Sequence, residues 1–257
     1  MIQKNIKYSG ASDRNLLDVI YEPSASGLPV ILFIHGGSWM TGSKDLYTKL
    51  GENFYARGFV AVVINYRLFP GTDVYGMVDD CRAALNWCKE HVEEYGGSKD
   101  QIFLMGHSAG GHLAASAGLR EEDTRHTLAG FILIDAFGLS AYHFLTVHGV
   151  MVPEFFAGIF GKIDSQWKLA APDKMVRENL PPFLILSGGE TYPFLAYDND
   201  NFAKLLRSKD NHVDQKIVPG LSHMQMIYEY ESVETKTFKD TVLWMQRQLV
   251  HNLPKTK

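Results

Sequence analysis

Short, uninterrupted apolar runs recur along the chain, and stretches of helical periodicity separate them. Most of these runs are rich in β-branched residues and lack polar alternation, which predicts strands covered on both faces. The predicted strands are residues 5–9, 15–22, 29–34, 59–65, 101–105, 130–135, 182–187 and 214–218. The predicted helices are residues 45–57, 75–95, the stretch that follows Ser108, 198–208 and 232–250. Repeated alternation of buried strands and helices predicts an α/β fold, in which a mostly parallel eight-stranded sheet is flanked by helices.

The segment from about 136 to 176 interrupts this alternation. It is rich in Phe, Tyr and Trp, is punctuated by Gly and Pro, and contains no predicted strand. Its position favours a small cap that contributes an aromatic wall to a site, although a pair of helices that simply cover the sheet fits the same pattern. With no repeat, low-complexity stretch or linker, residues 1–257 are expected to form a single domain carrying this insertion.

Composition excludes several classes of partner. Of the 257 residues, 46% are hydrophobic and 21% charged, which is ordinary for a globular protein. The net charge of −4 gives no reason to expect nucleic acid or an anionic membrane as partner. No apolar run is long enough to span a bilayer, and the N-terminus lacks a signal-peptide core. We therefore expect a cytoplasmic protein, although a signal peptide that has already been removed would leave the same sequence.

The pattern Gly-x-Ser-x-Gly, centred on Ser108, joins one predicted strand to the next helix. A serine on so sharp a turn adopts strained backbone angles, and Gly106 and Gly110 remove Cβ atoms that would collide. Its hydroxyl then stands at a helix N-terminus, where free N–H groups favour negative charge. A turn whose serine merely caps the helix is the simpler alternative. We predict that Ser108 is a nucleophile.

A nucleophilic serine needs a base and a carboxylate that orients the base. His223 is the best base, because it follows the last predicted strand in a Pro-Gly turn and comes after the serine in chain order. Glu190 follows the strand at 182–187 after two glycines and is the predicted acid. Asp198 and Asp200 are the alternatives, although both fall where the next helix is expected to begin.

The tetrahedral oxyanion of acyl transfer needs backbone N–H donors. Ala109, directly after the nucleophile, is one predicted donor, and Gly37 or Ser38 in the loop after residues 29–34 is the other. No metal or cofactor is expected. The residues expected to line the substrate pocket are Trp39, His107 and Tyr192.

Five motifs occur in a recognisable order along the chain. They are His35-Gly36-Gly37-Ser38-Trp39, Asn65-Tyr66-Arg67-Leu68-Phe69-Pro70, Asp79-Asp80, Gly106-His107-Ser108-Ala109-Gly110-Gly111-His112-Leu113-Ala114 and Pro219-Gly220-Leu221-Ser222-His223. With these motifs the chain resembles the α/β-hydrolase fold family, and in particular the small esterases with a His-Gly-Gly loop that are related to hormone-sensitive lipase. Feruloyl esterases, kynurenine formamidases and isoprenylcysteine methylesterases are similar compact members.

The resemblance implies a serine carboxylesterase that cleaves small or aromatic acyl esters through an acyl-enzyme on Ser108. Its expected partner is a small-molecule ester, with a homo-oligomer left open. An amide hydrolase of the arylformamidase type would use the same residues, and a non-catalytic binding protein is the third alternative. The chain departs from the family at two positions: Ser38 replaces a common third glycine, and the usual acid motif Gly-x-x-Asp-x-Pro is absent. Alignment on Pro193 would place Tyr192 at the acid position, whereas alignment on Gly188-Gly189 places Glu190 there.

Overall fold

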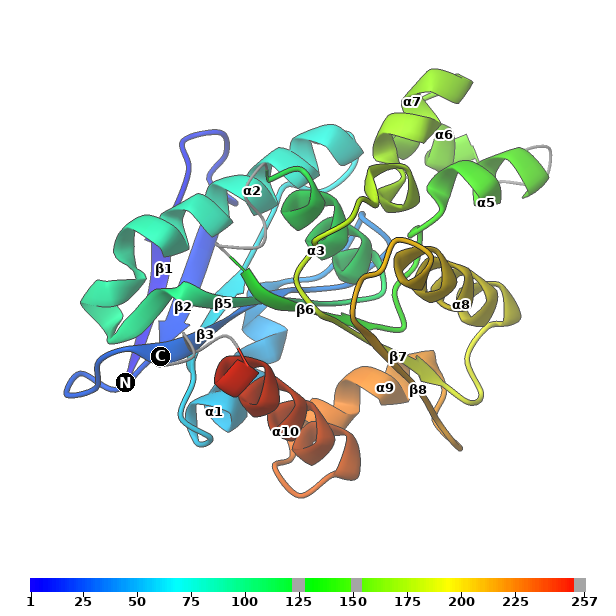
Figure 1. Ribbon diagram of the computed structural model, residues 1–257. Coiled ribbons are helices and arrows are strands. Elements are labelled where there is room, and N and C mark those ends of the chain that lie inside the picture. Colours follow the sequence, from blue (N-terminus) through cyan, green and yellow to red (C-terminus); the bar gives the residue numbers. More distant parts are fainter. Residues whose placement is uncertain (122–127, 149–153, 252–257) are drawn as a thin grey trace.

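One twisted sheet of eight strands forms the centre of the molecule (Figure 1). The computed structural model describes residues 1–121, 128–148 and 154–251. The strand order is β1-β2-β4-β3-β5-β6-β7-β8; β2 runs antiparallel to β1 and β4, and all other neighbours are parallel. The strands are β1 (Ile2–Lys7), β2 (Leu16–Ile20), β3 (Leu28–Ile34), β4 (Val60–Ile64), β5 (Gly97–His107), β6 (Leu128–Ile134), β7 (Phe183–Gly188) and β8 (Val213–Val218). The predicted mostly parallel, eight-stranded sheet is confirmed.

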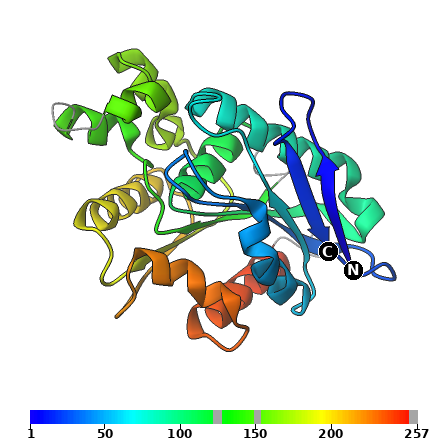
Figure 2. The same cartoon turned by 180° about the vertical axis from the view of Figure 1, so that it is seen from behind.

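Helices cover both faces of the sheet (Figures 1 and 2). The first face carries α2 (Val74–His91), α3 (Ala109–Leu119) and α8 (Pro193–Arg207). The second face carries α1 (Thr48–Tyr55), α9 (His223–Tyr228) and α10 (Lys236–His251). Short 3-10 turns are η1 (Lys44–Tyr47), η2 (Val92–Tyr95), η3 (Pro172–Met175) and η4 (Glu229–Glu231). The segment expected to form the cap folds into α5 (Ala141–His148), α6 (Glu154–Phe160) and α7 (Asp164–Ala170), which stand together beside α3 and α8.

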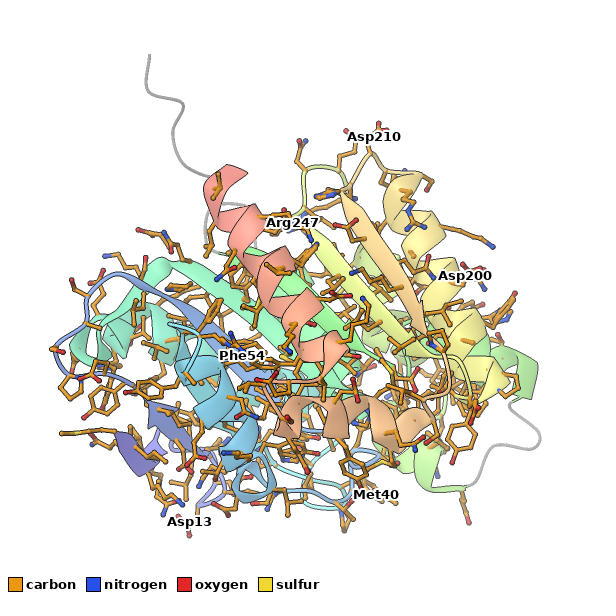
Figure 3. The ribbon with its side chains drawn as sticks, turned by 90° about the horizontal axis from the view of Figure 1, so that it is seen from below. Asp13, Met40, Phe54, Asp200, Asp210 and Arg247 are labelled. Atoms are coloured by element: carbon orange, nitrogen blue, oxygen red, sulfur yellow. The ribbon has the colours of Figure 1, made fainter. Side chains whose placement is uncertain are left out.

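Two apolar cores, one on each face, explain why the central strands lack polar alternation. Successive side chains of β3 enter opposite cores: Leu32 lies in one core and Phe33 in the other, and both are fully buried. Figure 3 views the second face, where α10 lies across the sheet and Phe54 of α1 packs beneath it. Because helices cover both faces of the sheet, the side chains of these strands are shielded from water on either side. Every position therefore favours an apolar residue.

Two helices differ from the sequence-based expectation. α8 begins at Pro193, five residues before the predicted start, because proline fits the first turn of a helix without losing a hydrogen bond. Asp198 therefore lies inside the helix and not at its N-terminus. The short helix α9 was not predicted, although Ser222 and Gln225 form the capping box that marks its start.

No helix among the described residues is both long enough and apolar enough to cross a bilayer. The two cysteines, Cys81 and Cys88, are buried in α2 and form no disulfide.

Candidate active site

The turn between β5 and α3 holds Ser108 in the strained conformation expected of a nucleophile elbow. Ser108 has φ 54° and ψ −123°, although it is not a glycine. A Cβ atom on Gly106 would overlap the carbonyl oxygen of Gly110, and one on Gly110 would overlap that of Ile34. The two flanking glycines are therefore required by the close approach of three backbone segments. The strain is concentrated where the Ser108 side chain leaves the sheet.

Replacing Gly110 with alanine should therefore destabilise the fold. We expect a loss of about 3 kcal/mol in the free energy of unfolding, because backbone atoms must move to admit the methyl group. Urea unfolding, monitored by circular dichroism, measures this free energy of unfolding. Gly10→Ala is the matched control, since a Cβ atom at that position meets nothing within 4 Å. Equal stability of the two variants would contradict the packing argument.

His223, the first residue of α9, bridges the serine and a carboxylate. Its Nε2 lies 3.0 Å from Ser108 Oγ, and its Nδ1 lies 2.7 Å from Asp135 Oδ2. Because an ionised carboxylate only accepts hydrogen bonds, Nδ1 carries the proton and Nε2 is the acceptor for the serine hydroxyl. The predicted pairing of Ser108 with His223 is thus present in the structure.

The carboxylate partner of His223 is Asp135, at the end of β6, so the predicted pairing with Glu190 is wrong. Asp135 has no exposed surface and a positive φ of 44°. Besides His223, it accepts hydrogen bonds from the backbone N–H of Gly188, at 3.3 Å, and from the Thr191 hydroxyl. These donors fix the carboxylate in front of the imidazole ring.

Glu190 and the two alternative acids lie elsewhere. Glu190 is exposed in the turn after β7, where its backbone N–H bonds to the carbonyl of Leu221. Asp198 accepts hydrogen bonds from the backbone N–H groups of Gly138 and Ser140, at 3.2 and 2.9 Å, and so ties α8 to the start of the cap. Asp200 pairs with Lys204 at 2.6 Å. In the described part of the chain, none of these three carboxylates is a hydrogen-bond partner of His223, whose Nδ1 bonds to Asp135.

His107 lies behind the imidazole ring of His223 and is almost fully buried. Its ring centroid is 4.6 Å from that of His223, and its Nε2–H donates to the His223 carbonyl oxygen at 3.1 Å. Burial lowers the pKa of His107 to about 3, helped by the neighbouring His223. A neutral ring in this position supports the backbone of His223. His107 therefore does not lie in the substrate pocket, where the sequence places it.

The loop after β3 lies against the elbow, as an oxyanion loop must. A Cβ atom on Gly36 would stand 2.9 Å from the His107 carbonyl oxygen and 3.2 Å from Ser108 Cβ. Gly37 has φ 120°, which favours glycine, and Ser38 has φ 52°. The N–H groups of Gly37, Ser38 and Ala109 bond to no acceptor among the described residues. These N–H groups are thus available to an oxyanion, and their role stays a prediction.

Buried polar contacts hold this loop in place. The ring of Tyr66 stacks on His35 with centroids 4.5 Å apart, and its hydroxyl donates to the His35 carbonyl oxygen at 3.0 Å. Next in the chain, Arg67 forms an ion pair with the buried Asp80 at 2.8 Å. Tyr66 thus supports the loop after β3, and the Arg67–Asp80 ion pair fixes the chain directly after Tyr66.

An apolar cavity of about 340 Å³ opens between the cap and α8. Its lining residues are Phe137, His143, Phe144, Pro193, Phe194, Tyr197 and Asp198. Phe137 donates its backbone N–H to the Ser108 carbonyl oxygen at 3.1 Å. Tyr192 connects the cavity to the histidine, since its ring lies 5.6 Å from Phe194 and 5.8 Å from His223. The cavity therefore lies near the elbow through Phe137, although neither Ser108 nor His223 is among its lining residues.

Of the three predicted pocket residues, Tyr192 has a large exposed surface beside the site. Trp39 has none, and so it packs beneath the cap instead of lining the cavity. Its ring contacts Phe137 and Phe160 at 5.3 and 4.9 Å, and its indole N–H points to His112 Nδ1 at 3.4 Å. Within the described ranges no group of three His, Cys, Asp or Glu side chains is placed to hold a metal ion.

Buried titratable groups predict that acid destabilises the protein. Burial lowers the pKa of His35 and of His112 to about 4, and that of His107 to about 3, whereas burial raises the pKa of Asp198 to about 7. Between pH 4 and 6.5, unfolding lets three histidines take up protons while Asp198 releases one. Stability should therefore fall as the pH drops, by about 2 kcal/mol per pH unit.

Urea unfolding at pH 5, 6 and 7 measures this slope. Asp198→Asn removes the carboxyl group whose proton release on unfolding offsets the proton uptake by the histidines. The free energy of unfolding of this variant should therefore fall more steeply as the pH drops. A free energy of unfolding that is constant from pH 7 to pH 5 would contradict the neutral state of these histidines.

Comparison with known proteins gives the class to which this arrangement belongs. Esterase B from Lactobacillus rhamnosis superimposes with a TM-score of 0.82 at 20% identity, covering 98% of this chain and 85% of that one. Thermogutta terrifontis esterase 2 superimposes with a TM-score of 0.75 at 22% identity, covering 100% and 97%. The chain thus shares the α/β-hydrolase fold of these esterases. The family model BD-FAE matches residues 17–199, and the chain belongs to this family.

Curated relatives have similar sequences but are longer. A probable isoprenylcysteine alpha-carbonyl methylesterase of Arabidopsis thaliana is 28% identical over 89% of this chain and 52% of its own length. A probable carboxylic ester hydrolase of Mycobacterium tuberculosis, LipM, is 31% identical over 72% of this chain and 47% of its own. The chain thus spans about half the length of the curated relatives that it matches.

Proposed function

We propose that the protein is a serine carboxylesterase whose nucleophile is Ser108. The observation that carries this proposal is the hydrogen-bonded series from Ser108 Oγ through His223 to the buried Asp135 carboxylate. The names of its curated relatives, carboxylic ester hydrolase and methylesterase, support the same reaction.

In the proposed reaction, Ser108 Oγ attacks the ester carbonyl carbon while His223 Nε2 accepts the hydroxyl proton. Asp135 keeps Nδ1 protonated and stabilises the imidazolium that forms. The N–H groups of Ala109 and of Gly37 or Ser38 donate to the oxyanion, each contributing about 3–4 kcal/mol to the barrier reduction. His223 then protonates the leaving alcohol. A water molecule activated by the same ring cleaves the acyl-enzyme and restores Ser108.

The cavity beside the elbow supports small or aromatic acyl groups as substrates. Phe137, Phe144 and Phe194 form a cluster of rings whose centroids lie 5.1 to 5.8 Å apart. An aromatic acyl chain would gain both apolar burial and edge-to-face contacts there. We propose this cavity as the acyl-binding pocket, with Tyr192 at its mouth.

A fluorophosphonate probe tests the proposed nucleophile. We expect one covalent adduct per chain, located on Ser108 by peptide mass spectrometry and abolished in His223→Ala. A folded protein that remains unlabelled would favour the alternative of a non-catalytic binding protein.

The arylformamidase alternative uses the same residues, so substrate comparison decides it. Phenyl acetate, a feruloyl ester and N-formylaniline should be hydrolysed with kcat/KM values that favour the two esters at least tenfold. A preference for the formamide would replace the esterase proposal by the amide hydrolase. Cytoplasmic location and homo-oligomer formation stay predictions.

A further inference from the structure

The loop after β3 is strained at the position where it is proposed to bind the oxyanion. Ser38 and Trp39 have φ angles of 52° and 62°, in the left-handed region that residues other than glycine rarely adopt. Such backbone angles persist only where the surrounding structure holds them. The carbonyl oxygen of Trp39 accepts the backbone N–H of Phe69 at 2.9 Å. The side chain of Trp39 provides a second constraint.

The indole of Trp39 is enclosed by the cap and by α3. It has no exposed surface, and its ring lies 6.1 and 4.9 Å from the rings of Phe156 and Phe160 in α6. Its N–H donates to Nδ1 of His112 at 3.4 Å. A buried indole N–H is costly without an acceptor, so this contact selects the rotamer in which the N–H faces His112. The orientation of Trp39 therefore depends on an acceptor in α3.

His112 can accept this hydrogen bond because of its tautomer. The residue lies in the first turn of α3, on the helix that follows Ser108, and has no exposed surface. Burial lowers its pKa to about 4, so near pH 7 the ring is neutral and carries one N–H. Nε2 lies 2.8 Å from the carbonyl oxygen of Ala170, at the end of α7, and a carbonyl oxygen only accepts. The proton is therefore on Nε2, and Nδ1 is left to accept the N–H of Trp39.

We propose that His112 is a positioning residue for the oxyanion loop and acts through the indole of Trp39. The inference rests on the proposed esterase function, because it concerns the stabilisation of the oxyanion. His112 holds Trp39, and Trp39 holds the strained backbone on which the proposed donors Gly37 and Ser38 lie. The oxyanion exists only after attack on the carbonyl, so a displaced donor lowers kcat and leaves substrate affinity almost unchanged.

Two amide variants of His112 separate the contact with Trp39 from the contact with Ala170. The amide of asparagine reaches the position of Nδ1 and can accept from Trp39, whereas that of glutamine reaches the position of Nε2 and can donate to Ala170. We expect His112→Gln to lower kcat for p-nitrophenyl acetate about 30-fold, with KM changed less than about threefold. His112→Asn, which keeps the acceptor, should lower kcat less than about fivefold. Circular dichroism checks that each variant is folded.

Trp39→Phe removes the indole N–H and keeps an aromatic ring. Alone it should lower kcat about tenfold. Combined with His112→Gln it should lower kcat no further than His112→Gln does, because the two residues act through one contact.

A transition-state analogue measures the oxyanion site directly. With 2,2,2-trifluoroacetophenone, Ser108 Oγ bonds to the carbonyl carbon, its proton passes to His223 Nε2, and the π electrons of the carbonyl remain on its oxygen as an oxyanion. The inhibition constant should rise in proportion to the loss of kcat, about 30-fold in His112→Gln. Lower stability alone would not raise this constant, because it is measured on the folded enzyme.

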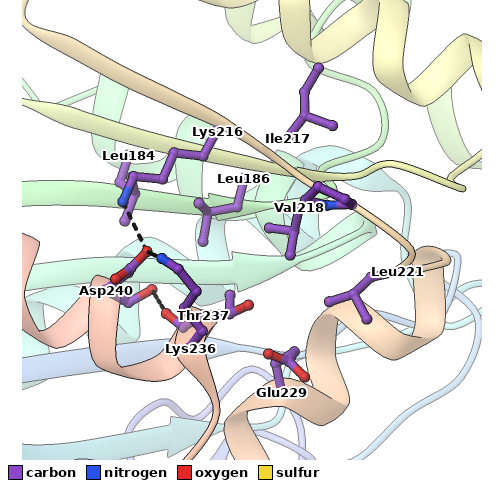
Figure 4. A pocket seen from close by; sticks show the side chains of 12 residues that line it. Leu184, Leu186, Lys216, Ile217, Val218, Leu221, Glu229, Lys236, Thr237 and Asp240 are labelled. Carbon is purple, nitrogen blue, oxygen red and sulfur yellow. Dashed lines mark hydrogen bonds and ion pairs between the residues drawn. The ribbon is translucent and has the colours of Figure 1, made fainter.

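Two control variants lack any contact with Trp39. The Arg120 side chain also joins α3 to the cap, since its Nη2 donates to the carbonyl oxygen of Leu169 at 2.8 Å. On the opposite face of the sheet, Asp240 pairs with Lys216 and Lys236 at 3.3 and 2.7 Å (Figure 4). Arg120→Met and Asp240→Asn each remove such ties, and both should leave kcat and the inhibition constant within about twofold.

Three results would overturn this inference and leave the esterase proposal standing. They are equal kcat values in His112→Gln and His112→Asn, a loss of kcat in His112→Gln without a parallel rise in the inhibition constant, and an equal loss of kcat in Arg120→Met. An unsubstituted protein that neither hydrolyses the ester nor binds the ketone would overturn the proposed function, and this inference with it.

Discussion

Replacing Ser108 with alanine is expected to reduce kcat for p-nitrophenyl acetate by about 10⁶-fold while the fold is retained. The reason is that no other group can form the acyl-enzyme, and the oxyanion donors alone leave only a small residual rate. Steady-state hydrolysis, with circular dichroism to confirm folding, provides the measurement.

Ser187→Ala is the matched control for this loss. Ser187 is also buried at the end of a central strand, and its hydroxyl forms no hydrogen bond among the described residues. Its removal should change kcat less than twofold. Hydrolysis by Ser108→Ala at more than about one thousandth of the original rate would show that another residue is the nucleophile.

Replacing Asp135 with asparagine is expected to reduce kcat by about 10⁴-fold, the scale found when the aspartate of a serine-protease triad is amidated. The amide can donate to His223 Nδ1, which favours the tautomer with the proton on Nε2, facing Ser108 Oγ. A ring in that tautomer cannot accept the serine proton. Measurement of kcat at pH 7.5 on the purified variants tests this expectation.

Glu190→Gln is the comparison that decides between the two carboxylates. Because Glu190 is exposed and does not contact His223, its amidation should leave kcat within about twofold. If Glu190→Gln caused the larger loss, Asp135 would not be the acid of the active enzyme. Both substitutions preserve side-chain shape, so a comparison of their rates is little affected by packing.

The sheet and the elbow could be predicted because each depends on local sequence. Buried strands need apolar residues at every position, and the close approach of Gly106 and Gly110 to backbone carbonyls admits no side chain. Ser222 and Gln225 likewise mark the start of α9, since a capping box is recognisable in the sequence. Local constraints of this kind leave a direct mark on the residues that satisfy them.

The acid could not be chosen in the same way. Asp135 and Glu190 both follow a buried strand and both fall between Ser108 and His223, so chain order and strand ends favour neither. What decides is the positive φ of Asp135 and the donors around its carboxylate, which come from residues more than fifty positions away. Such contacts depend on how strands are placed in space, which periodicity does not encode.

The residues that line the cavity could not be predicted from the sequence either. Trp39 follows the predicted oxyanion loop, which favours a place in the wall of the substrate pocket. Its side chain, however, has no exposed surface beneath the cap. The cavity is lined instead by rings from the cap and α8, and no spacing rule links these two segments.

Asp135 lies at the end of β6 and not in the turn after β7. The residues proposed for proton transfer are therefore separate from those proposed to bind the acyl group. Ser108 and Asp135 follow neighbouring strands, and the Ser108 N–H bonds to the carbonyl of Ile134 at 3.0 Å, so these two residues are tied to the middle of the sheet. The turn after β7 supports Asp135 through the Thr191 hydroxyl, while Phe194, in the first turn of α8, lines the cavity and the ring of Tyr192 lies beside that of Phe194. Under the proposed function, substitutions of Tyr192 and Phe194 would alter which acyl group is accepted and would leave the contacts of Ser108, His223 and Asp135 in place. New substrate preferences would then arise by single substitutions that keep the proposed catalytic residues intact.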